Sequence, residues 1–388
     1  VEQEDVKFIR LAFCDISGRQ KNISIMPQEL KRAFSQGISF DASAIGGFGG
    51  VVESDLFLFP IPSTLSLMPW RPSRGKVVRM FCKIRYPDGR PFPLDCRALL
   101  GRAIREAQDL GLSVQIGAEF EFYLFKTDVD GNPTTQPFDH AGYMDMAPED
   151  KGENVRREIC LTLESMGILP ECSHHEEGPG QNEIDFRYSD AMTAADNALL
   201  FASTVRAVAV SNGLYADFSP KPIAGEAGNG LHINISLLES GDQPVTPYFM
   251  AGILDHIREM TAFLNPSEAS YRRLGEKKAP RFVTWSPENR SQLIRIPAAQ
   301  GQYKRMELRS PDPGVNPYLA YALVIFAGLD GVKRKRLPPD PVNANLYTAG
   351  PEVTAALQVL PRTLAEARRV AAESEFIRNT LPESLWKL

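Results

Sequence analysis

Three segments of the chain alternate polar and apolar residues with the two-residue period of a β-strand. They span 117–125, 228–236 and 304–309. Because successive strand side chains point to opposite faces, each segment can bury its apolar row and present its polar row. The polar residues that share a face are Glu119 and Glu121 in the first segment, His232, Asn234 and Ser236 in the second, and Arg305, Glu307 and Arg309 in the third. The pattern predicts three strands that offer charged groups on one surface.

Helical periodicity appears beyond residue 90. The spacing of apolar residues predicts helices over 97–110, 153–166, 191–212 and 317–329. The first 90 residues are instead predicted to be β-rich, with a strand over 6–13. A turn at 86–90, followed closely by two prolines, marks the boundary. We therefore predict an N-terminal domain over 1–90 and a larger domain over 91–388.

Several segments are predicted to be loops. The glycine-rich segment 40–50 has the composition of an ordered loop rather than a regular element. Longer loops are expected at 125–150, 265–290 and 331–352, and loops of that length in a compact chain are commonly functional. The basic run 333–336 is interpreted as a solvated turn rather than a nucleic-acid contact.

Composition narrows the class of protein. The net charge of -5 over 388 residues argues against general binding of nucleic acid. We see no signal peptide and no apolar run approaching the roughly 18 residues of a membrane span, so no membrane partner is expected. The five cysteines form no CxxC pair, which favours reduced thiols and a cytoplasmic location.

The segment 174–186 changes the interpretation of the carboxylates. Taken alone, Glu119 and Glu121 also suit the solvated face of an amphipathic strand. Glu176 and Glu183 bring the number of acidic groups to a level where their repulsion must be offset, because otherwise some would take up protons. Divalent cations would offset that repulsion.

The ligand types indicate which cation. A site rich in oxygen with one imidazole favours magnesium or manganese over zinc or copper. His232 alone would more often be a structural histidine, but its polar neighbours on one strand face favour a ligand role. His174 and His175 are an alternative pair of zinc ligands, although no Cys or His cluster completes a tetrahedral set.

Arginines supply the basic half of the predicted site. Arg290, Arg295, Arg305 and Arg309 lie beside apolar, strand-like residues, and arginine suits bidentate contacts with phosphate or carboxylate. A salt-bridged sheet surface is the alternative for any one of them. Together with carboxylates and a divalent metal they indicate phosphoryl transfer, in which positioning and charge neutralisation dominate catalysis. The chain has no Walker A sequence and no GxGxxG motif.

These motifs, in this order, resemble the glutamine synthetase superfamily, in its type I-like bacterial branch, over nearly the whole chain. The segments that carry the resemblance are 40–43, 53–55, 119–121, 175–176, 180–183, 221–222, 230–232, 289–291, 295–297, 307–312, 316–318 and 327–331. The resemblance implies an α+β fold, with an N-terminal β-grasp domain and a catalytic domain built on a curved antiparallel sheet. It also implies a ring oligomer, such as a dodecamer, with each active site between adjacent subunits.

The resemblance implies an ATP-dependent ligase of nitrogen metabolism. In the family, the γ-carboxylate of glutamate attacks the γ-phosphate of ATP, and ammonia or another amine captures the γ-glutamyl phosphate. Asp41 of a neighbouring subunit resembles the aspartate that binds and deprotonates ammonium. Alternatives are a γ-glutamyl-amine synthetase that uses another amine or acid, and a non-catalytic relative that keeps only the ring.

The resemblance assigns roles residue by residue. Glu121, Glu176 and Glu183 resemble the ligands of one metal ion, and Glu119, His232 and Glu307 those of a second. Arg290, Arg295 and Arg305 match arginines that face phosphate, with Arg290 also counted as catalytic, whereas Gly228, Arg273 and Arg309 match positions that hold glutamate. Glu171, Tyr188, Asn234 and Ser236 match positions that contact the nucleotide.

Departures from the family pattern concern the second substrate. The family's flap carries a glutamate that closes over the ammonium site, but the shorter run here has Lys278 at that position, with Glu276 as the alternative carboxylate. Ala227 replaces an asparagine that contacts glutamate. Tyr347 resembles the adenylylated tyrosine of some relatives, although the residues after it differ. The acid and the amine are therefore left open.

Overall fold

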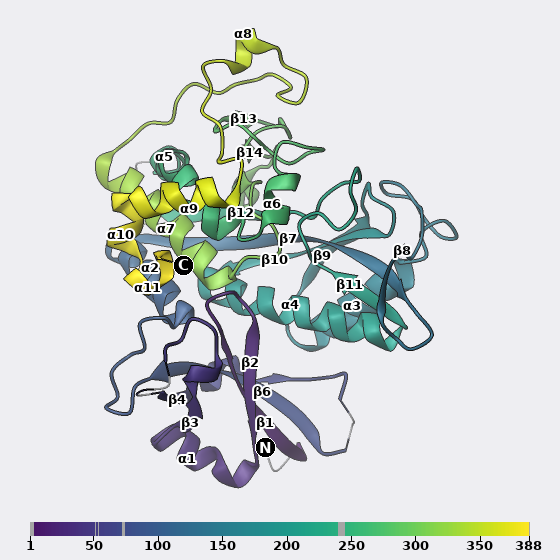
Figure 1. The fold of residues 1–388 in the computed structure, drawn as a ribbon, viewed down its shortest axis with the longest axis vertical. Helices are drawn as coiled ribbons and strands as arrows, with labels where there is room; N and C mark the ends of the chain where they lie inside the picture. Colours follow the sequence, from purple (N-terminus) through teal and green to yellow (C-terminus); the bar gives the residue numbers. More distant parts are fainter. Residues whose placement is uncertain (1–3, 51, 53, 72–73, 240–244, 388) are drawn as a thin grey trace.

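The structure, a computed structural model, describes residues 4–50, 52, 54–71, 74–239 and 245–387. Its N-terminal part is a six-stranded sheet in the order β2-β1-β6-β4-β3, with β5 paired to β6. The strands are β1 (Val6–Cys14), β2 (Gln20–Ile25), β3 (Ile38–Asp41), β4 (Asp55–Pro60), β5 (Ser66–Leu67) and β6 (Lys76–Arg85). The short helix α1 (Leu30–Ser35) lies beside this sheet (Figure 1).

A larger, mostly antiparallel sheet forms the centre of the rest of the chain. In the described residues it has nine strands in the order β13-β14-β15-β12-β7-β10-β9, with β8 and β11 also paired to β7. Its strands are β7 (Leu112–Thr127), β8 (Pro133–Pro137), β9 (Pro170–His175), β10 (Gln181–Asp190), β11 (Leu214–Asp217), β12 (Leu231–Glu239), β13 (Trp285–Pro287), β14 (Ile294–Ile296) and β15 (Met306–Leu308). The long strand β7 lies at the centre (Figure 1).

Helices cover the sheet and complete the core. They are α2 (Cys96–Asp109), α3 (Glu153–Ser165), α4 (Ala191–Ser211), α5 (Thr246–Leu264), α6 (Glu268–Arg273), α7 (Pro317–Arg334), α8 (Pro351–Thr354), α9 (Leu364–Glu373), α10 (Glu375–Thr380) and α11 (Glu383–Trp386). Helix α7 is almost wholly buried and packs against both α2 and α5. No helix in the described ranges is long and apolar enough to cross a membrane.

The packing of α4 decides which face of β7 is polar. The ring of Phe120 lies 4.9 Å from that of Phe201 on α4, and Phe186 of β10 joins the same aromatic cluster. These apolar residues alternate with Glu119 and Glu121, whose side chains therefore lie on the opposite face of the sheet. Burial of the aromatic row thus fixes where the carboxylates can lie.

The four predicted helices are confirmed to within a few residues, and α7 extends beyond its predicted end. The predicted turn over the basic run 333–336 is therefore wrong, since its first two residues close α7 and Lys335 is the left-handed cap. The prediction of an irregular loop at 40–50 is also wrong at its start, where β3 includes residues 40 and 41. The segments 125–150 and 265–290 contain short strands and α6, because local pairing with β7 and β14 satisfies their backbone groups.

The two parts of the chain meet at the turn between β1 and β2. Gly18 has a φ of +79°, and a Cβ there would lie 2.8 Å from the backbone of Asn316. The amide of Asn316 in turn donates to the carbonyls of Asp15 and Ile16, at 3.1 Å and 3.3 Å. This close contact places the N-terminal sheet against the start of α7.

Candidate active site

Strand pairing brings the predicted charged residues together on one face of the larger sheet. His232 lies opposite Glu119 across β12 and β7, and Glu183 lies opposite Glu121 across β7 and β10. On the other side of β12, Glu307 pairs with Asn234. The tertiary fold therefore assembles the charged face that the alternating pattern predicts.

One candidate cation group contains Glu119, His232 and Glu307, whose ligand atoms all lie within 4.8 Å of one another. His232 Nδ1 is 3.1 Å from Glu119 Oε2 and 3.6 Å from Glu307 Oε1. Glu307 is fully buried, and its two oxygens accept hydrogen bonds from Arg309 and, at 2.7 Å, from Arg295. The three residues predicted for the second metal thus converge.

A second group lies around Glu176 and Glu183. Their carboxylates and His174 place ligand atoms within 4.8 Å of one another, and His174 Nε2 is 3.3 Å from Glu176. Glu121 lines the same small cavity as Glu176. His175 points elsewhere, since its ring nitrogens contact Asp139 and the Glu176 carbonyl. Glu176 and Glu183 of the predicted trio therefore share a candidate cation group with His174, and Glu121 adjoins them through the cavity.

The pKa values of these carboxylates reflect their crowding. Burial and the neighbouring carboxylates of Asp185 and Glu121 raise the pKa of Glu183 well above its usual value. Burial also raises the pKa of Glu121. Burial alone would raise the pKa of Glu119 as well, but its hydrogen bond with His232 and the nearby charges hold it at about 2. Divalent cations would relieve this repulsion, so the oxygen-rich donor set fits them.

A cavity of about 290 Å³ adjoins Glu119 on the side of β12. The predicted nucleotide-contacting residues that line it are Glu171, Tyr188, Asn234, Ser236 and Arg305. The Arg305 guanidinium donates to Asn234 Oδ1 at 2.9 Å, and the Asn234 amide donates to Glu119 Oε1 at 2.8 Å. The cavity is therefore joined by hydrogen bonds to the first cation group.

A smaller cavity on the other side of the carboxylates is lined by two of the three predicted glutamate-binding residues, whereas the third, Arg309, is buried and bonds Glu307. Arg273 and Gly228 line it together with Glu121. Arg273 is buried and donates to the carbonyls of Ser310 and Arg309, at 2.8 Å and 3.3 Å. A Cβ at Gly228 would lie 2.5 Å from the Pro220 carbonyl and 2.9 Å from the Arg273 side chain, so only glycine fits this approach.

Two of the predicted site residues are exposed. Asp41 is exposed at the end of β3, in the N-terminal sheet (Figure 1), and its carboxylate accepts hydrogen bonds from Ser43 that lower its pKa. Arg290 is exposed, and its backbone carbonyl accepts a hydrogen bond from Tyr347 at 3.1 Å. Asp41 therefore belongs to the N-terminal sheet, whereas the charge of Arg290 acts on Tyr143 beside the second cation group.

The shortened flap places the positively charged side chain of Lys278 beside the second cation group. Lys278 Nζ lies 2.9 Å from Glu177, 3.8 Å from Glu176 and 4.6 Å from the centre of the Tyr143 ring. Burial alone would lower its pKa, but the contact with Glu177 raises it, so the ammonium form is favoured. Glu276 instead pairs with Lys221 at 2.9 Å and so lies away from this position.

Sequence reasoning gave no role to Tyr143, Asp185 and Gln181, and it considered His174 only as a zinc ligand. Asp185 lies opposite Glu119 across β7 and β10, and it forms a further acidic group with Glu119 and Glu183. The sequence did contain a signal for Asp185, because it lies two residues after Glu183 on an alternating strand and so shares the same face. Tyr143 offered no signal, because it comes from an irregular segment that only the tertiary fold brings to Lys278.

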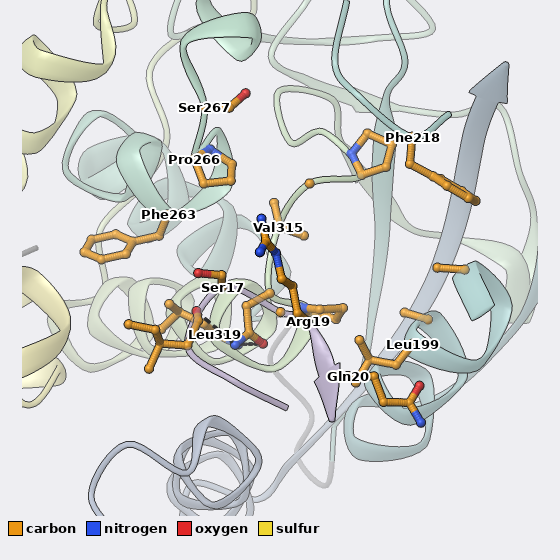
Figure 2. Close-up of a pocket in the computed structure, with 18 of the residues that line it drawn as sticks. Ser17, Arg19, Gln20, Leu199, Phe218, Phe263, Pro266, Ser267, Val315 and Leu319 are labelled. Carbon is orange, nitrogen blue, oxygen red and sulfur yellow. Dashed lines mark hydrogen bonds between the residues drawn. The ribbon is translucent and has the colours of Figure 1, made fainter. Parts of the chain in front are cut away.

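A further cavity, of about 940 Å³, lies elsewhere in the described part of the chain. Figure 2 shows Ser17 and Arg19 from the β1–β2 turn and Gln20 from the start of β2 among its lining residues, together with Leu199 and Phe218. Phe120 lines it too, which places it on the face of β7 opposite Glu119 and Glu121. This cavity therefore lies on the opposite face of the sheet from the charged cluster and is not the candidate reaction site.

Comparisons with known proteins give the family. The model of the glutamine synthetase catalytic domain matches residues 93–387, and that of the glutamine synthetase β-grasp domain matches residues 5–87. The glutamine synthetases of Methanosarcina mazei and Clostridium saccharobutylicum are each 44% identical over 401 aligned residues, covering 100% of this chain and 90% of the relative. A Staphylococcus aureus glutamine synthetase is 43% identical, covering 99% of this chain and 90% of the relative.

Solved structures agree with this assignment. Apo GmaS has a TM-score of 0.90 at 29% identity, covering 100% of this chain and 92% of that one. A GmaS–ADP complex has a TM-score of 0.89 at 28% identity, covering 99% of this chain and 91% of that one. Plasmodium falciparum glutamine synthetase, at 24% identity, shares the fold with a TM-score of 0.87 over 100% of this chain and 92% of that one. The chain belongs to the glutamine synthetase family.

Proposed function

We propose that this chain joins glutamate to ammonia or another amine in a reaction driven by ATP. The observation that carries the proposal is the position of the two carboxylate groups, which lie between the cavity lined by Tyr188 and Ser236 and the cavity lined by Arg273. A nucleotide in the first cavity and an acid in the second would meet at the carboxylates. The relatives named glutamine synthetase and GmaS support the same reaction class.

The residues have the chemistry that such a ligase needs. We propose Mg²⁺ or Mn²⁺ at both groups, with Glu121, Glu176 and Glu183 holding one ion and Glu119, His232 and Glu307 the other. The bound ions would supply positive charge that neutralises the ATP phosphates. Arg295 and Arg305, with Arg290 from its exposed segment, would add fixed positive charge around the phosphoryl group in transfer.

The two steps follow from this arrangement. A γ-carboxylate oxygen of glutamate, oriented by Arg273 and Arg309, attacks the γ-phosphorus of ATP, and the bond to the ADP oxygen breaks. The amine nitrogen then attacks the acyl carbon, the carbon–oxygen bond to phosphate breaks, and phosphate leaves. The proton lost by the amine passes to a carboxylate, for which we propose Asp41 of the partner subunit. This role requires the ring oligomer, of which a dodecamer is one form.

The five free cysteines support a cytoplasmic location for the protein.

A panel of acids and amines, assayed for ADP formation with Mg²⁺ or Mn²⁺, tests the function. We expect glutamate to be accepted as the default acid, because the chain has both Arg273 and Arg309, and we expect no ADP formation without a divalent cation. Isothermal titration with a non-hydrolysable ATP analogue would show metal-dependent binding. Absence of both signals at millimolar ligand would defeat the proposal and favour a non-catalytic relative.

We propose that Lys278 makes ammonia a poor substrate. Its side-chain ammonium group already contacts Glu176, Glu177 and Tyr143, the groups that would otherwise attract a substrate ammonium ion. Two like charges about 4 Å apart repel by on the order of 1–4 kcal/mol. The enzyme is therefore expected to prefer another amine, or an acid whose own carboxylate pairs with Lys278.

Lys278→Glu is expected to lower the KM for ammonium by about tenfold or more, since about 1.4 kcal/mol corresponds to a tenfold change. The measurement is ammonia-dependent glutamine synthesis at varied ammonium concentration. Lys333→Glu is the control for the same charge change, because Lys333 is exposed on α7 and contacts Glu106 at 3.5 Å rather than either cation group. Efficient glutamine synthesis by the unmodified protein, with no effect of Lys278→Glu, would show that Lys278 does not select the amine.

A further inference from the structure

Gln181 is a fully buried amide at the start of β10, and its side chain makes hydrogen bonds from both ends. Its Oε1 accepts from the Gly178 backbone N–H at 3.0 Å. Its Nε2 faces three acceptors, each at 3.2 Å: Glu121 Oε2, the Gly228 carbonyl and Asn229 Oδ1. Gln181 therefore touches a candidate metal ligand and a substrate-binding loop at once.

These contacts require an amide at this position. The Gly178 N–H can only donate, whereas a carboxylate and a backbone carbonyl can only accept. Glutamate at position 181 would face Glu121 with a second carboxylate, and an apolar side chain would leave the buried Gly228 carbonyl without this donor. Each such change leaves a buried polar group poorly satisfied, which is costly.

The bond to Glu121 fixes which of its oxygens can hold a cation. Glu121 Oε2 also accepts from the Gly230 backbone N–H at 2.8 Å, so this oxygen is committed to two donors. The other oxygen, Oε1, lies 4.0 Å from His232 Nε2. Gln181 and Gly230 therefore hold the carboxylate so that Oε1 remains available to a cation.

The bonds to residues 228 and 229 fix the substrate loop. Gly228 lies directly against the buried Arg273, the predicted ligand of the acid. Asn229 is fully buried, and its amide donates to the carbonyls of Asp217 and Ser219, at 3.2 Å and 2.9 Å. A shift of Glu121 would therefore be transmitted through Gln181 to the loop beside Arg273.

We propose that Gln181 is a positioning residue that links cation binding at Glu121 to acid binding beside Gly228 and Arg273, so that the two ligands bind cooperatively. The proposal rests on the proposed function, because that function supplies the cation and the acid. Both ligands would favour the arrangement in which Gln181 bonds Glu121 and Gly228, so each is expected to favour the other to the same extent.

Calorimetric titration of the full chain with Mn²⁺, with glutamate, and with glutamate in the presence of Mn²⁺ tests the link. We expect Mn²⁺ to tighten glutamate binding by at least about fivefold in the unmodified protein. Gln181→Met is expected to weaken Mn²⁺ binding by about 10–100-fold, as loss of a residue behind a metal ligand commonly does, and to abolish the coupling. Gln181→Glu, which keeps the volume and the bond to Gly178, is the second variant should Gln181→Met fail to fold.

Asn182→Ala is the matched control. Asn182 is the next residue, is equally buried, and contacts Arg156 and the Gly180 carbonyl rather than the candidate site. We expect it to lower the thermal midpoint while keeping Mn²⁺ affinity and coupling. Unchanged coupling in both Gln181 variants, or an equal loss in Asn182→Ala, would overturn the proposal. Failure of the unmodified protein to bind Mn²⁺ or glutamate would instead defeat the proposed function.

Discussion

Glu307→Gln is expected to lower ADP formation by about 10²–10³-fold, the usual effect of removing one electrostatic contact from a phosphoryl-transfer or acyl-transfer site. Glu307 is fully buried between the guanidinium groups of Arg295 and Arg309 and lies 3.6 Å from His232 Nδ1. The amide keeps the shape but removes the negative charge, so two arginines lose their charged partner and one cation group loses a carboxylate. Breaking a buried ion pair from one side costs about 3–5 kcal/mol.

Two measurements separate the functional loss from the structural one. Mn²⁺ affinity by titration and the thermal midpoint are both expected to fall in Glu307→Gln. Asp196→Asn is the matched control, since Asp196 is a buried carboxylate that accepts hydrogen bonds from Arg97 at 3.0 Å and 2.9 Å and belongs to none of the candidate cation groups. It should lower the midpoint but keep Mn²⁺ affinity. Normal ADP formation and Mn²⁺ affinity in Glu307→Gln would remove Glu307 from the proposed site.

Gly252→Ala is expected to destabilise the protein severely. Helix propensity alone would predict that alanine stabilises the helix by up to about 1 kcal/mol relative to glycine. Gly252 of α5 faces α7 so closely that a Cβ would lie 2.1 Å from the Ala327 carbonyl oxygen and 2.7 Å from the Gly331 nitrogen. Both obstacles are backbone of a buried helix, so no side chain can move aside. The helices must separate, and we expect a loss of at least about 3 kcal/mol.

Gly101→Ala provides the control for this prediction, because Gly101 also lies inside a helix, α2. A Cβ there would meet only side-chain atoms of Arg105 and Met192, at 3.5 Å and 3.6 Å, which is ordinary contact. We expect Gly101→Ala to raise the thermal midpoint slightly and Gly252→Ala to reduce folded yield or lower the midpoint strongly. A midpoint for Gly252→Ala equal to that of Gly101→Ala would show that α5 and α7 tolerate separation.

Local signals predicted much of the architecture because they depend on near neighbours. The apolar spacing of 153–166 and 191–212 marked α3 and α4, since one face of each helix must be buried. The end of α7 was missed because Lys333 and Arg334 resemble a solvated turn, yet basic residues are also favourable in the last turn of a helix.

Local sequence signals do not predict which flap residue lies beside the second cation group. Glu276 and Lys278 were both candidates for the position beside the second cation group, and nothing local distinguishes them. The structure pairs Glu276 with Lys221, which lies 55 residues earlier, and turns Lys278 toward Glu176 and Glu177. The choice depends on partners distant in sequence.

The sequence by itself determined the family, through the order of its motifs along the chain. It also determined the polar face of each strand and the types of ligand, because alternation and composition act within a few residues. Only the tertiary structure decided the register that places His232 opposite Glu119, although 113 residues separate them. It also brought Tyr143 to Lys278 and Gln181 to Glu121 and Gly228. The physical reason is that register and side-chain contacts follow from burial of the whole sheet against α4, a condition that no short segment contains.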